Sequence, residues 1–310
     1  MEDQRRLTIG IPRALLYYRY APLWQGFFDR LGVQVIYSDS TSRLHAEKGA
    51  EYAVDETCYS EKLWFGHVSQ LIGKCDAILV PRISNFGRRR FMCTRFEALP
   101  DLTRTVFYHT GQKFLDYSID VLQKADEEKA FISLGTQLGF SPKAAKKAWR
   151  EAGKACQRRW KLRVKEEEQR LREPGMKILL CAHSYVIEDA YIGQPILQFL
   201  KNNDITVIRA DLCDREAALK KSAELSPTCR WEVNREIMGS AALRAEHVNG
   251  MILVSAFPCG PDSMTNDMIA RKLKGIPTLQ LVIDGQSGTA GLETRLESFV
   301  DILRFKEGTL

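Results

Sequence analysis

The stretch Gly250–Lys274, GMILVSAFPCGPDSMTNDMIARKLK, combines an apolar run, a tight turn and a helical segment. The run Met251–Ala256 predicts a buried strand, because it consists of apolar and small residues bounded by turn signals. The segment Pro258–Pro261 predicts the turn, and Asp262–Leu273 predicts the helix that follows. Cys259 therefore stands between a strand end and a helix N-terminus, whose positive end favours a thiolate. This position makes Cys259 a candidate metal ligand.

The same alternation of strands and helices extends outward in both directions. Runs such as VQVIY and TLQLVI are rich in β-branched residues, and the segments between them repeat apolar residues at helical spacing. Alternation of this kind predicts parallel sheets covered by helices on both faces. Helical structure is also expected from about Gly111 onward. The expected strands are Arg5–Pro12, Val33–Tyr37, Asp76–Pro81, Arg104–Tyr108, Met176–Ala182, Ile205–Arg209, Met251–Ala256 and Thr278–Ile283.

The predicted fold class is α/β, with two doubly wound (Rossmann-like) parallel-sheet domains joined by a helical linker. The length of 310 residues exceeds what one hydrophobic core usually organises. The expected domains are residues 1–140, with Cys58 and Cys93, and residues 176–310, with Cys259, separated by a basic helical linker over 141–175. Ligands of such sheets bind beyond the carboxyl ends of the strands. A site in the cleft between the domains is therefore expected.

Composition indicates a cytoplasmic protein. The N-terminal sequence MEDQRRLTIGIPR is polar and charged, unlike a signal peptide, and no apolar run approaches the roughly 20 residues of a membrane helix. The net charge is +6, but residues 143–173 hold twelve Lys or Arg and five Glu. We expect this basic segment to be a solvated linker helix, with an acidic protein partner as the alternative. No nucleic-acid module is recognised, so neither nucleic acid nor a membrane is an expected partner.

The eight cysteines are unlikely to form a disulfide framework in a cytoplasmic chain. No CxxC pair is present, which argues against a zinc ribbon or a thioredoxin-type site. Cys181 lies inside the apolar run KILLCA and Cys75 precedes a strand, so both are expected to pack as small hydrophobic residues.

Three of the cysteines share one feature of position. Cys58 begins a predicted helix, Cys93 lies in the loop after the third strand, and Cys259 lies on the turn described above. Each is expected at the sheet edge where parallel-sheet proteins bind ligands, and helix N-termini offer N–H groups to an anionic iron–sulfur cluster. The long sequence gaps are unlike compact ferredoxin spacing. Spacing alone does not select a shared cluster over three unrelated loop cysteines.

Five stretches resemble the acyl-CoA dehydratase activase-related family, which is similar to the cluster-bearing component of 2-hydroxyacyl-CoA dehydratases and to double-cubane cluster proteins. The resemblance covers about residues 7–109 and 176–305 and is weak across the linker. The stretches are GIPRALLYYRYAPLWQGFFDRLGVQVIYSDST, DETCYSEKLWFGHV, DAILVPRI, FPCGPDS and DGQSGTAGLETRLESFVDIL.

The resemblance implies a 4Fe–4S cluster between two α/β domains, held by Cys58, Cys93 and Cys259. A double-cubane cluster is the alternative. It needs two such sets of three cysteines, so two chains would have to share it. The resemblance also implies an ATP-hydrolysing activator protein with its own cluster, an acyl-CoA substrate, and a homo- or heterodimer. This chain has no Walker A sequence, GxxxxGK[ST], so a partner would hydrolyse the ATP. The implied reaction is a dehydratase (lyase) reaction or an ATP-coupled reduction.

Departures from the family pattern keep the reaction open. The turn Asp284–Thr289 lacks the expected Glu and His residues, and Ser60 and Ser184 stand where proline is usual. Two alternatives therefore remain. The first is a cluster-based reductase of a small non-CoA molecule. The second is a non-catalytic cluster carrier or CoA-binding protein.

Four further residues are candidates for substrate binding. Ser287 and Gly288 lie in a glycine-containing turn between a strand and a helix that could cradle a phosphate, although a plain turn fits equally well. Arg13 follows the first strand and could hold an anion, or it could be a surface arginine. His67 lies in the helix opened by Cys58, where a packing role competes with proton donation. The sequence identifies no catalytic residue.

Overall fold

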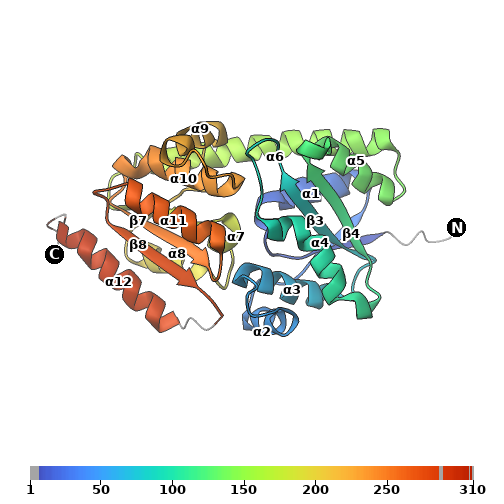
Figure 1. The fold of residues 1–310 in the computed structure, drawn as a ribbon, viewed down its shortest axis with the longest axis horizontal. Coiled ribbons are helices and arrows are strands. Elements are labelled where there is room, and N and C mark those ends of the chain that lie inside the picture. Colours follow the sequence, from blue (N-terminus) through green and yellow to red (C-terminus); the bar gives the residue numbers. More distant parts are fainter. Residues whose placement is uncertain (1–6, 286–288, 307, 309–310) are drawn as a thin grey trace. The chain divides into compact units, whose positions relative to one another are not determined.

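A computed structural model describes residues 7–285, 289–306 and 308. The chain forms two compact units, Met1–Trp160 and Lys161–Leu310. Each unit contains one four-stranded sheet whose strand pairs are all parallel, with helices packed around it (Figure 1). This arrangement confirms the predicted α/β class with two parallel-sheet domains. The division between the units falls within one long helix, α6 (Pro142–Arg170).

Unit 1 has the strand order β2-β1-β3-β4. The central strands are buried because each is covered on both faces, and apolar residues such as Ile9 and Ile78 are fully enclosed. Trp24 donates from Nε1 to the hydroxyl oxygen of Tyr117 at 2.9 Å, which joins a helix to the outer strand inside the core. The strands are β1 (Thr8–Ile11), β2 (Gln34–Tyr37), β3 (Ala77–Asn85) and β4 (Phe114–Asp120).

The helices of unit 1 follow from amphipathic segments with clear end signals. The first helix ends at Gly32, which adopts a left-handed conformation (φ 70°) as a helix C-terminal glycine commonly does. The helices are α1 (Tyr17–Leu31), α2 (Arg43–Tyr52), α3 (Tyr59–Leu71), α4 (Thr94–Val106), α5 (Glu127–Gln137) and the first part of α6.

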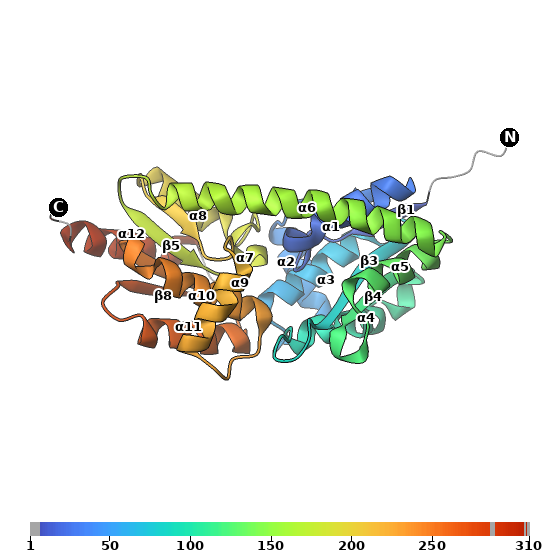
Figure 2. The ribbon, with the colours of Figure 1, turned by 90° about the horizontal axis from the view of Figure 1, so that it is seen from above.

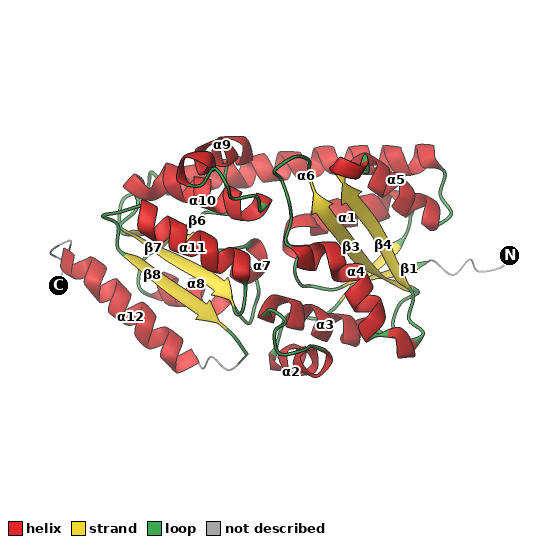
Figure 3. Cartoon of the chain, in the orientation of Figure 1, coloured by secondary structure: helices red, strands yellow, loops and turns green. Residues whose placement is uncertain are grey.

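Unit 2 has the strand order β6-β5-β7-β8. Strand β7 is buried along its entire length, as its apolar sequence predicts. Figure 3 shows β7 and β8 side by side with α11 and α12 near them. The elements are β5 (Lys177–Cys181), α7 (Ser184–Ile187), α8 (Gln194–Asn202), β6 (Thr206–Arg209), α9 (Arg215–Leu225), α10 (Glu232–Arg244), β7 (Gly250–Ala256), α11 (Gly260–Lys272), β8 (Thr278–Ile283) and α12 (Thr289–Lys306).

The two units share one topology. In each sheet the first strand in sequence lies between the second and the third, and the fourth lies outside the third. The chain direction across the sheet therefore reverses between β1 and β3 in unit 1, and between β5 and β7 in unit 2. Ligands of open α/β sheets bind at the carboxyl ends of the strands at such a switch point. Residues that follow these four strands are consequently the first place to look for a site.

The prediction of a fourth strand at Arg104–Tyr108 is wrong. These residues form the end of α4 and the start of a short 3-10 helix, and the true fourth strand is β4, where helical structure had been expected. The aromatic residue that suggested a strand, Phe107, is fully buried and packs against Tyr52 at a ring distance of 4.7 Å. Its apolar character therefore reflects core packing at a helix end. Strand β4 alternates buried and half-buried residues, as a strand at the edge of a sheet does.

The other expected strands and helices correspond to elements of the structure, with ends that differ by a few residues. The long basic helix predicted within 141–175 is α6. In the described part of the chain, no helix combines the length and the apolar character that crossing a membrane requires.

Candidate functional site

Cys58 and Cys93 occupy the same kind of position in unit 1. Cys58 is the N-cap residue of α3, with φ −63° and ψ 147°, and Cys93 is the N-cap residue of α4, with φ −61° and ψ 142°. Both are half-buried free cysteines. At this position a side chain lies next to the unpaired N–H groups and the positive end of the helix dipole. Two helix N-termini thus each present one sulfur atom.

The two sulfur atoms lie close enough for their charges to interact. Burial raises the pKa of the Cys58 thiol to about 12, and the charges of Glu61 and Cys93 add to this, while a main-chain contact with Glu61 opposes it. A thiol whose pKa is raised in this way is a poor free nucleophile. As a metal ligand, Cys58 would have to give up its proton when the metal binds.

The first turn of α3 contains buried polar atoms without hydrogen-bond partners in the structure. These atoms are Oγ of Ser60 and both carboxylate oxygens of Glu61, whose residue is 1% exposed. Arg95 lies 3.2 Å from Glu61 as an ion pair, but burial is the larger effect and raises the pKa of Glu61 to about 7. Buried polar groups are nearly always paired in native proteins. The buried carboxylate of Glu61 has one ion-pair partner and no hydrogen bond, and the hydroxyl of Ser60 has no hydrogen bond, which fits a polar or charged group bound beside the two cysteines.

Helix α3 is held in place by close contact with α2. A Cβ atom on Gly66 would lie 2.0 Å from the carbonyl oxygen of His45, and one on Gly49 would lie 1.9 Å from that of Lys62. The two helix backbones therefore touch at both positions, and only glycine permits this approach. His45 and His67 stack between the helices with ring centroids 4.2 Å apart. This packing fixes where the N-terminus of α3, and hence Cys58, lies in unit 1.

Cys259 occupies in unit 2 the topological position that Cys93 occupies in unit 1. It is the N-cap residue of α11, the helix that follows the third strand of its sheet, and it is half-buried. Helix α10, which precedes that strand, has Trp231 as its N-cap residue where α3 of unit 1 has Cys58. The repeated topology therefore carries two cysteines at helix N-termini in unit 1 and one in unit 2.

A buried polar network that the sequence interpretation missed surrounds Asp262, in the first turn of α11. His183 lies with Nε2 at 2.8 Å from Oδ1 of Asp262, and Asn234 donates to the same oxygen at 2.7 Å. Burial works against the ionised form of Asp262, but His183, Asn234 and Cys259 together hold its pKa below the usual range. The carboxylate is therefore charged, so the imidazole directs its Nε2–H toward it. Nδ1 of His183 is buried and has no partner in the structure.

His183 belongs to the switch point of unit 2. It follows β5 as the N-cap residue of α7, and Cys259 follows β7, the neighbouring strand. In unit 1 the equivalent positions hold Arg13, after β1, and Cys93, in the segment after β3. A histidine directly after the predicted strand Met176–Ala182 was the available signal. Arg13 was selected because it is a polar residue directly after the first predicted strand. The same criterion, applied to the strand that became β5, selects His183.

The four candidate substrate-binding residues have different surroundings. The main-chain N–H of Arg13 donates to Ser38 at 2.8 Å, its guanidinium lies 5.4 Å from the ring centre of Tyr37, and its Nε atom is buried without a hydrogen-bond partner in the structure. His67 is fully buried, and its two ring nitrogens contact hydroxyl groups of Ser38 and Thr41 at 2.8 and 3.0 Å. Ser287 and Gly288 lie outside the described residues.

The structure thus brings Cys58 and Cys93 together within unit 1, and it places Cys259 beside Asp262 and His183 within unit 2. Among the described residues, no group of three or more His, Cys, Asp or Glu side chains is already arranged to hold a metal ion. Unit 1 therefore presents two neighbouring thiols at helix N-termini, and unit 2 presents one at the corresponding position of its own sheet.

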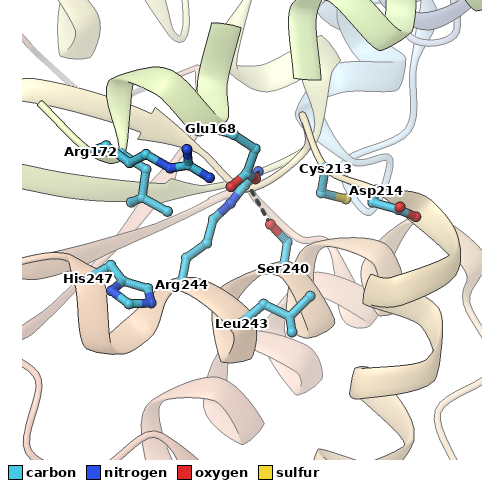
Figure 4. A pocket seen from close by; sticks show the side chains of 9 residues that line it. Glu168, Arg172, Cys213, Asp214, Ser240, Leu243, Arg244 and His247 are labelled. Carbon is cyan, nitrogen blue, oxygen red and sulfur yellow. Dashed lines mark hydrogen bonds and ion pairs between the residues drawn. The ribbon is translucent and has the colours of Figure 1, made fainter. Parts of the chain in front are cut away.

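Unit 2 also contains a cavity of about 380 Å³ beside the end of α6 (Figure 4). Its wall includes the guanidinium of Arg244, which is 3% exposed and pairs with Glu168. Arg244 also donates to Ser240 and to main-chain carbonyl oxygens of Arg209 and Leu212. The buried cation of the cavity is therefore committed to partners within the protein. The lining residues are Glu168, Leu171, Arg172, Cys213, Asp214, Ser240, Leu243, Arg244 and His247.

Comparison with known proteins identifies a family for most of the chain. The family model described as "CoA enzyme activase uncharacterised domain" matches residues 8–213, a range that includes Cys58 and Cys93 but ends before Cys259. Among solved structures, the crystal structure of ZnuA has 11% sequence identity over 96% of this chain and 98% of that chain, with a TM-score of 0.29. A likeness at this level carries no functional information. No curated protein sequence matches the chain.

Proposed function

The chain belongs to the family of CoA enzyme activase domains, and we propose that it is an iron–sulfur protein of the 2-hydroxyacyl-CoA dehydratase type. The observation that carries the proposal is the pairing of Cys58 and Cys93 at two helix N-termini, beside buried polar atoms of Ser60 and Glu61 that make no hydrogen bond in the structure. A family resemblance alone identifies a fold and a related chemistry, whereas a site must be argued from its residues.

The proposed cofactor is a 4Fe–4S cluster with Cys58, Cys93 and Cys259 as its cysteine ligands. When bound, such a cluster supplies one-electron transfer at a potential set by burial and by hydrogen bonds to its sulfur atoms. The chain's own contribution follows from the described contacts. Helix N-termini stabilise the negative charge of the thiolates, and burial of Cys58 limits the access of water.

The second part of the proposal concerns partners. The chain lacks a Walker A sequence, so an ATP-hydrolysing activator protein with its own cluster would deliver the electrons. The substrate would be an acyl-CoA or another small molecule, and the functional form would be a homo- or heterodimer. The proposed location is the cytoplasm, where thiols are kept reduced and available as cluster ligands.

A second candidate function keeps the fold and the cysteines but changes the reaction. Ser60 and Ser184 replace family prolines, and the turn Asp284–Thr289 lacks the family's Glu and His residues. Because these departures could change the substrate or the reaction, the alternatives are a cluster-based reductase of a small non-CoA molecule and a non-catalytic cluster carrier. Turnover of 2-hydroxyacyl-CoA thioesters with an activator separates the dehydratase from both alternatives.

The test of the cofactor is the content of iron and acid-labile sulfide after purification without oxygen, with an EPR spectrum after dithionite reduction. We expect about four irons per chain and the signal of a reduced cubane. About twice that iron, with an unusual spin state, would indicate a double cubane shared between chains. Protein that binds no iron even after reconstitution would contradict the proposal and leave a CoA-binding or nucleotide-binding protein.

The cysteine ligands are tested with single alanine variants. Cys58→Ala, Cys93→Ala and Cys259→Ala should each lose most of the bound iron, because each removes one of three thiolate ligands. Cys75→Ala and Cys156→Ala are the matched controls, since both residues are also half-buried free cysteines. Equal iron retention in the two groups would show that the ligand assignment is incorrect.

A further inference from the structure

Helix α6 has a continuous row of basic side chains along one face. Seven Lys or Arg residues follow one another at intervals of three or four residues, which is the spacing of one α-helical turn. All seven are exposed. We call this set the basic face of α6; its members are Lys143, Lys147, Arg150, Lys154, Arg158, Lys161 and Lys165.

The geometry of an α-helix makes this set a narrow stripe. At 3.6 residues per turn, the seven positions fall within about 80° of the helix circumference and extend over about 33 Å. Figure 2 shows α6 as one uninterrupted helix over this length. The opposite side of the helix packs against the protein, where Ala145, Ala148 and Ala152 are buried. The basic face therefore points away from the packed side.

Of the four other basic residues of α6, three form ion pairs, and Arg159 forms none among the described residues. Lys146 pairs with Glu128 at 2.5 Å, Arg163 pairs with Glu188 at 2.7 Å, and Arg170 lies 3.6 Å from Glu167. In the described part of the chain, no carboxylate forms an ion pair with any of the seven residues of the face. Like charges three or four residues apart destabilise a helix. The six successive pairs of the face therefore repel one another, and a partner of opposite charge would relieve this repulsion.

We propose that the basic face of α6 is a docking surface for an acidic helix of a partner protein. A helix with carboxylates at the same three- and four-residue intervals could lie along the stripe and neutralise it turn by turn. Five of the seven side chains are lysines, which are strongly hydrated point charges and therefore suit a transient, electrostatically steered encounter. The inference does not depend on the cofactor, because the face is defined by α6 alone.

Two other anionic partners fit the face less well. Insertion of a helix into the major groove of DNA requires a helix that projects, whereas α6 is packed along its opposite side. An interfacial membrane helix needs apolar side chains that enter the bilayer, and the face itself contains none; the nearest exposed large apolar residue on α6, Leu162, belongs to its flank. Outside residues 143–173 the net charge of the chain is close to zero, so this segment holds most of its excess positive charge.

The test compares two synthetic acidic peptides of about 24 residues, the length that spans the face. The first places its Glu residues on one helical face, and the second has the same composition with its Glu residues distributed around the helix. Binding of each labelled peptide to the full chain is measured by fluorescence anisotropy at low and moderate salt. We expect the one-faced peptide to bind about tenfold or more tightly than its isomer, with an affinity that falls as salt rises.

Charge-reversal variants separate the stripe from net charge. Combined Lys147→Glu, Arg150→Glu and Lys154→Glu substitutions should reduce binding of the one-faced peptide about tenfold or more. The control combines Lys74→Glu, Lys113→Glu and Lys274→Glu, exposed residues outside α6 that change net charge equally. Circular dichroism checks that both proteins are folded. Equal binding of the two peptides, equal weakening by the two variants, or tighter binding of duplex DNA or phosphatidylserine vesicles would each overturn the proposal.

Discussion

Nε2 of His183 lies 2.8 Å from Oδ1 of Asp262, an interaction that joins the end of β5 to the first turn of α11. Both side chains are about 95% buried. Asn234 donates to the same carboxylate oxygen, and Cys259 stands three residues earlier at the helix N-cap. The position of Cys259 in unit 2 therefore depends on the buried carboxylate of Asp262. The partners of that carboxylate, His183, Asn234 and Cys259, come from three different elements.

Removal of His183 should destabilise unit 2. His183→Ala leaves the buried carboxylate of Asp262 with Asn234 as its main remaining side-chain partner, and breaking a buried pair in this way costs about 3–5 kcal/mol. Asp262→Asn combined with His183→Ala should cost less than the sum of the single changes, because the double variant no longer contains the uncompensated charge. Hydrogen exchange of peptides from β5, β7 and α11 measures the effect in unit 2 specifically.

Additive losses in that double-mutant cycle would contradict the coupling of His183 to Asp262. A matched control is His247→Ala, which removes an exposed imidazole in the same unit. Its effect on exchange should stay within about 0.5 kcal/mol.

The contact between α2 and α3 leads to a second prediction. Gly66→Ala should destabilise unit 1 by about 2–3 kcal/mol, because its Cβ would lie 2.0 Å from the main-chain oxygen of His45 and the helices must separate. Gly153→Ala in α6 is the matched control, since nothing lies within 4 Å of the added Cβ. That variant should gain about 0.5–1 kcal/mol from helix propensity. Urea unfolding followed by tryptophan fluorescence reports mainly on unit 1, which contains four of the five tryptophans, Trp24, Trp64, Trp149 and Trp160.

Opposite signs for the two glycine variants are the essential result. A stabilising or neutral Gly66→Ala would show that α2 and α3 are farther apart than described. The position of Cys58 at the α3 N-terminus would then lose its structural support.

Most of the fold was predictable from the sequence because its elements carry strong local signals. The buried strand β7 is an unbroken apolar run, and α6 repeats alanine and tryptophan at helical spacing. Phe107 was misinterpreted because an aromatic, β-branched run at the end of a helix has the composition of a strand. Strand β4 was missed because an edge strand with alternating burial places polar residues between its apolar ones, so it contains no continuous apolar run.

The site was predictable only in part. Cys58, Cys93 and Cys259 were selected by their positions before helices, and each is an N-cap residue in the structure. His183 and the buried carboxylate of Glu61 were not selected, because their significance depends on burial and on partners distant in sequence. Asp262 and His183, for example, are 79 residues apart. No local pattern in the sequence contains that contact.

The buried histidine of unit 1 predicts acid sensitivity. Burial, with smaller contributions from the charges of His45 and Arg13, lowers the pKa of His67 from 6.5 to about 3. Between these two values the unfolded chain binds a proton at this residue and the folded chain does not, so stability is highest above pH 6.5 and falls on acidification. The contribution lost between about pH 7 and about pH 4 is about 3 kcal/mol.

This acid sensitivity is measured as the difference between variant and parent stability in urea at several pH values. His67→Gln, which keeps a hydrogen-bond donor and acceptor, should lose less stability on acidification than the parent chain. His109→Gln removes an exposed histidine and should leave the pH profile unchanged. Parallel profiles for His67→Gln and the parent would show that His67 titrates normally in the folded state.

The last prediction concerns Arg244, which ties three elements of unit 2 together. Its guanidinium donates to the carbonyl oxygens of Arg209 at 2.9 Å and Leu212 at 2.8 Å, to Ser240 at 3.0 Å, and to Glu168 of α6. Arg244→Met preserves most of the side-chain length but leaves these acceptors without their donor. Because a buried cation is removed from its partners, unit 2 should lose about 3–5 kcal/mol.

Arg172→Met is the control for Arg244→Met, because Arg172 lines the same cavity but is exposed. An exposed arginine contributes little, so this variant should stay within about 0.5 kcal/mol of the parent. Hydrogen exchange should show the loss in Arg244→Met at β6, at α10 and at the end of α6, the segments that the guanidinium joins. A similar small effect for both variants would mean that the cavity wall is not held by Arg244, and its cation would then be available to an anionic ligand.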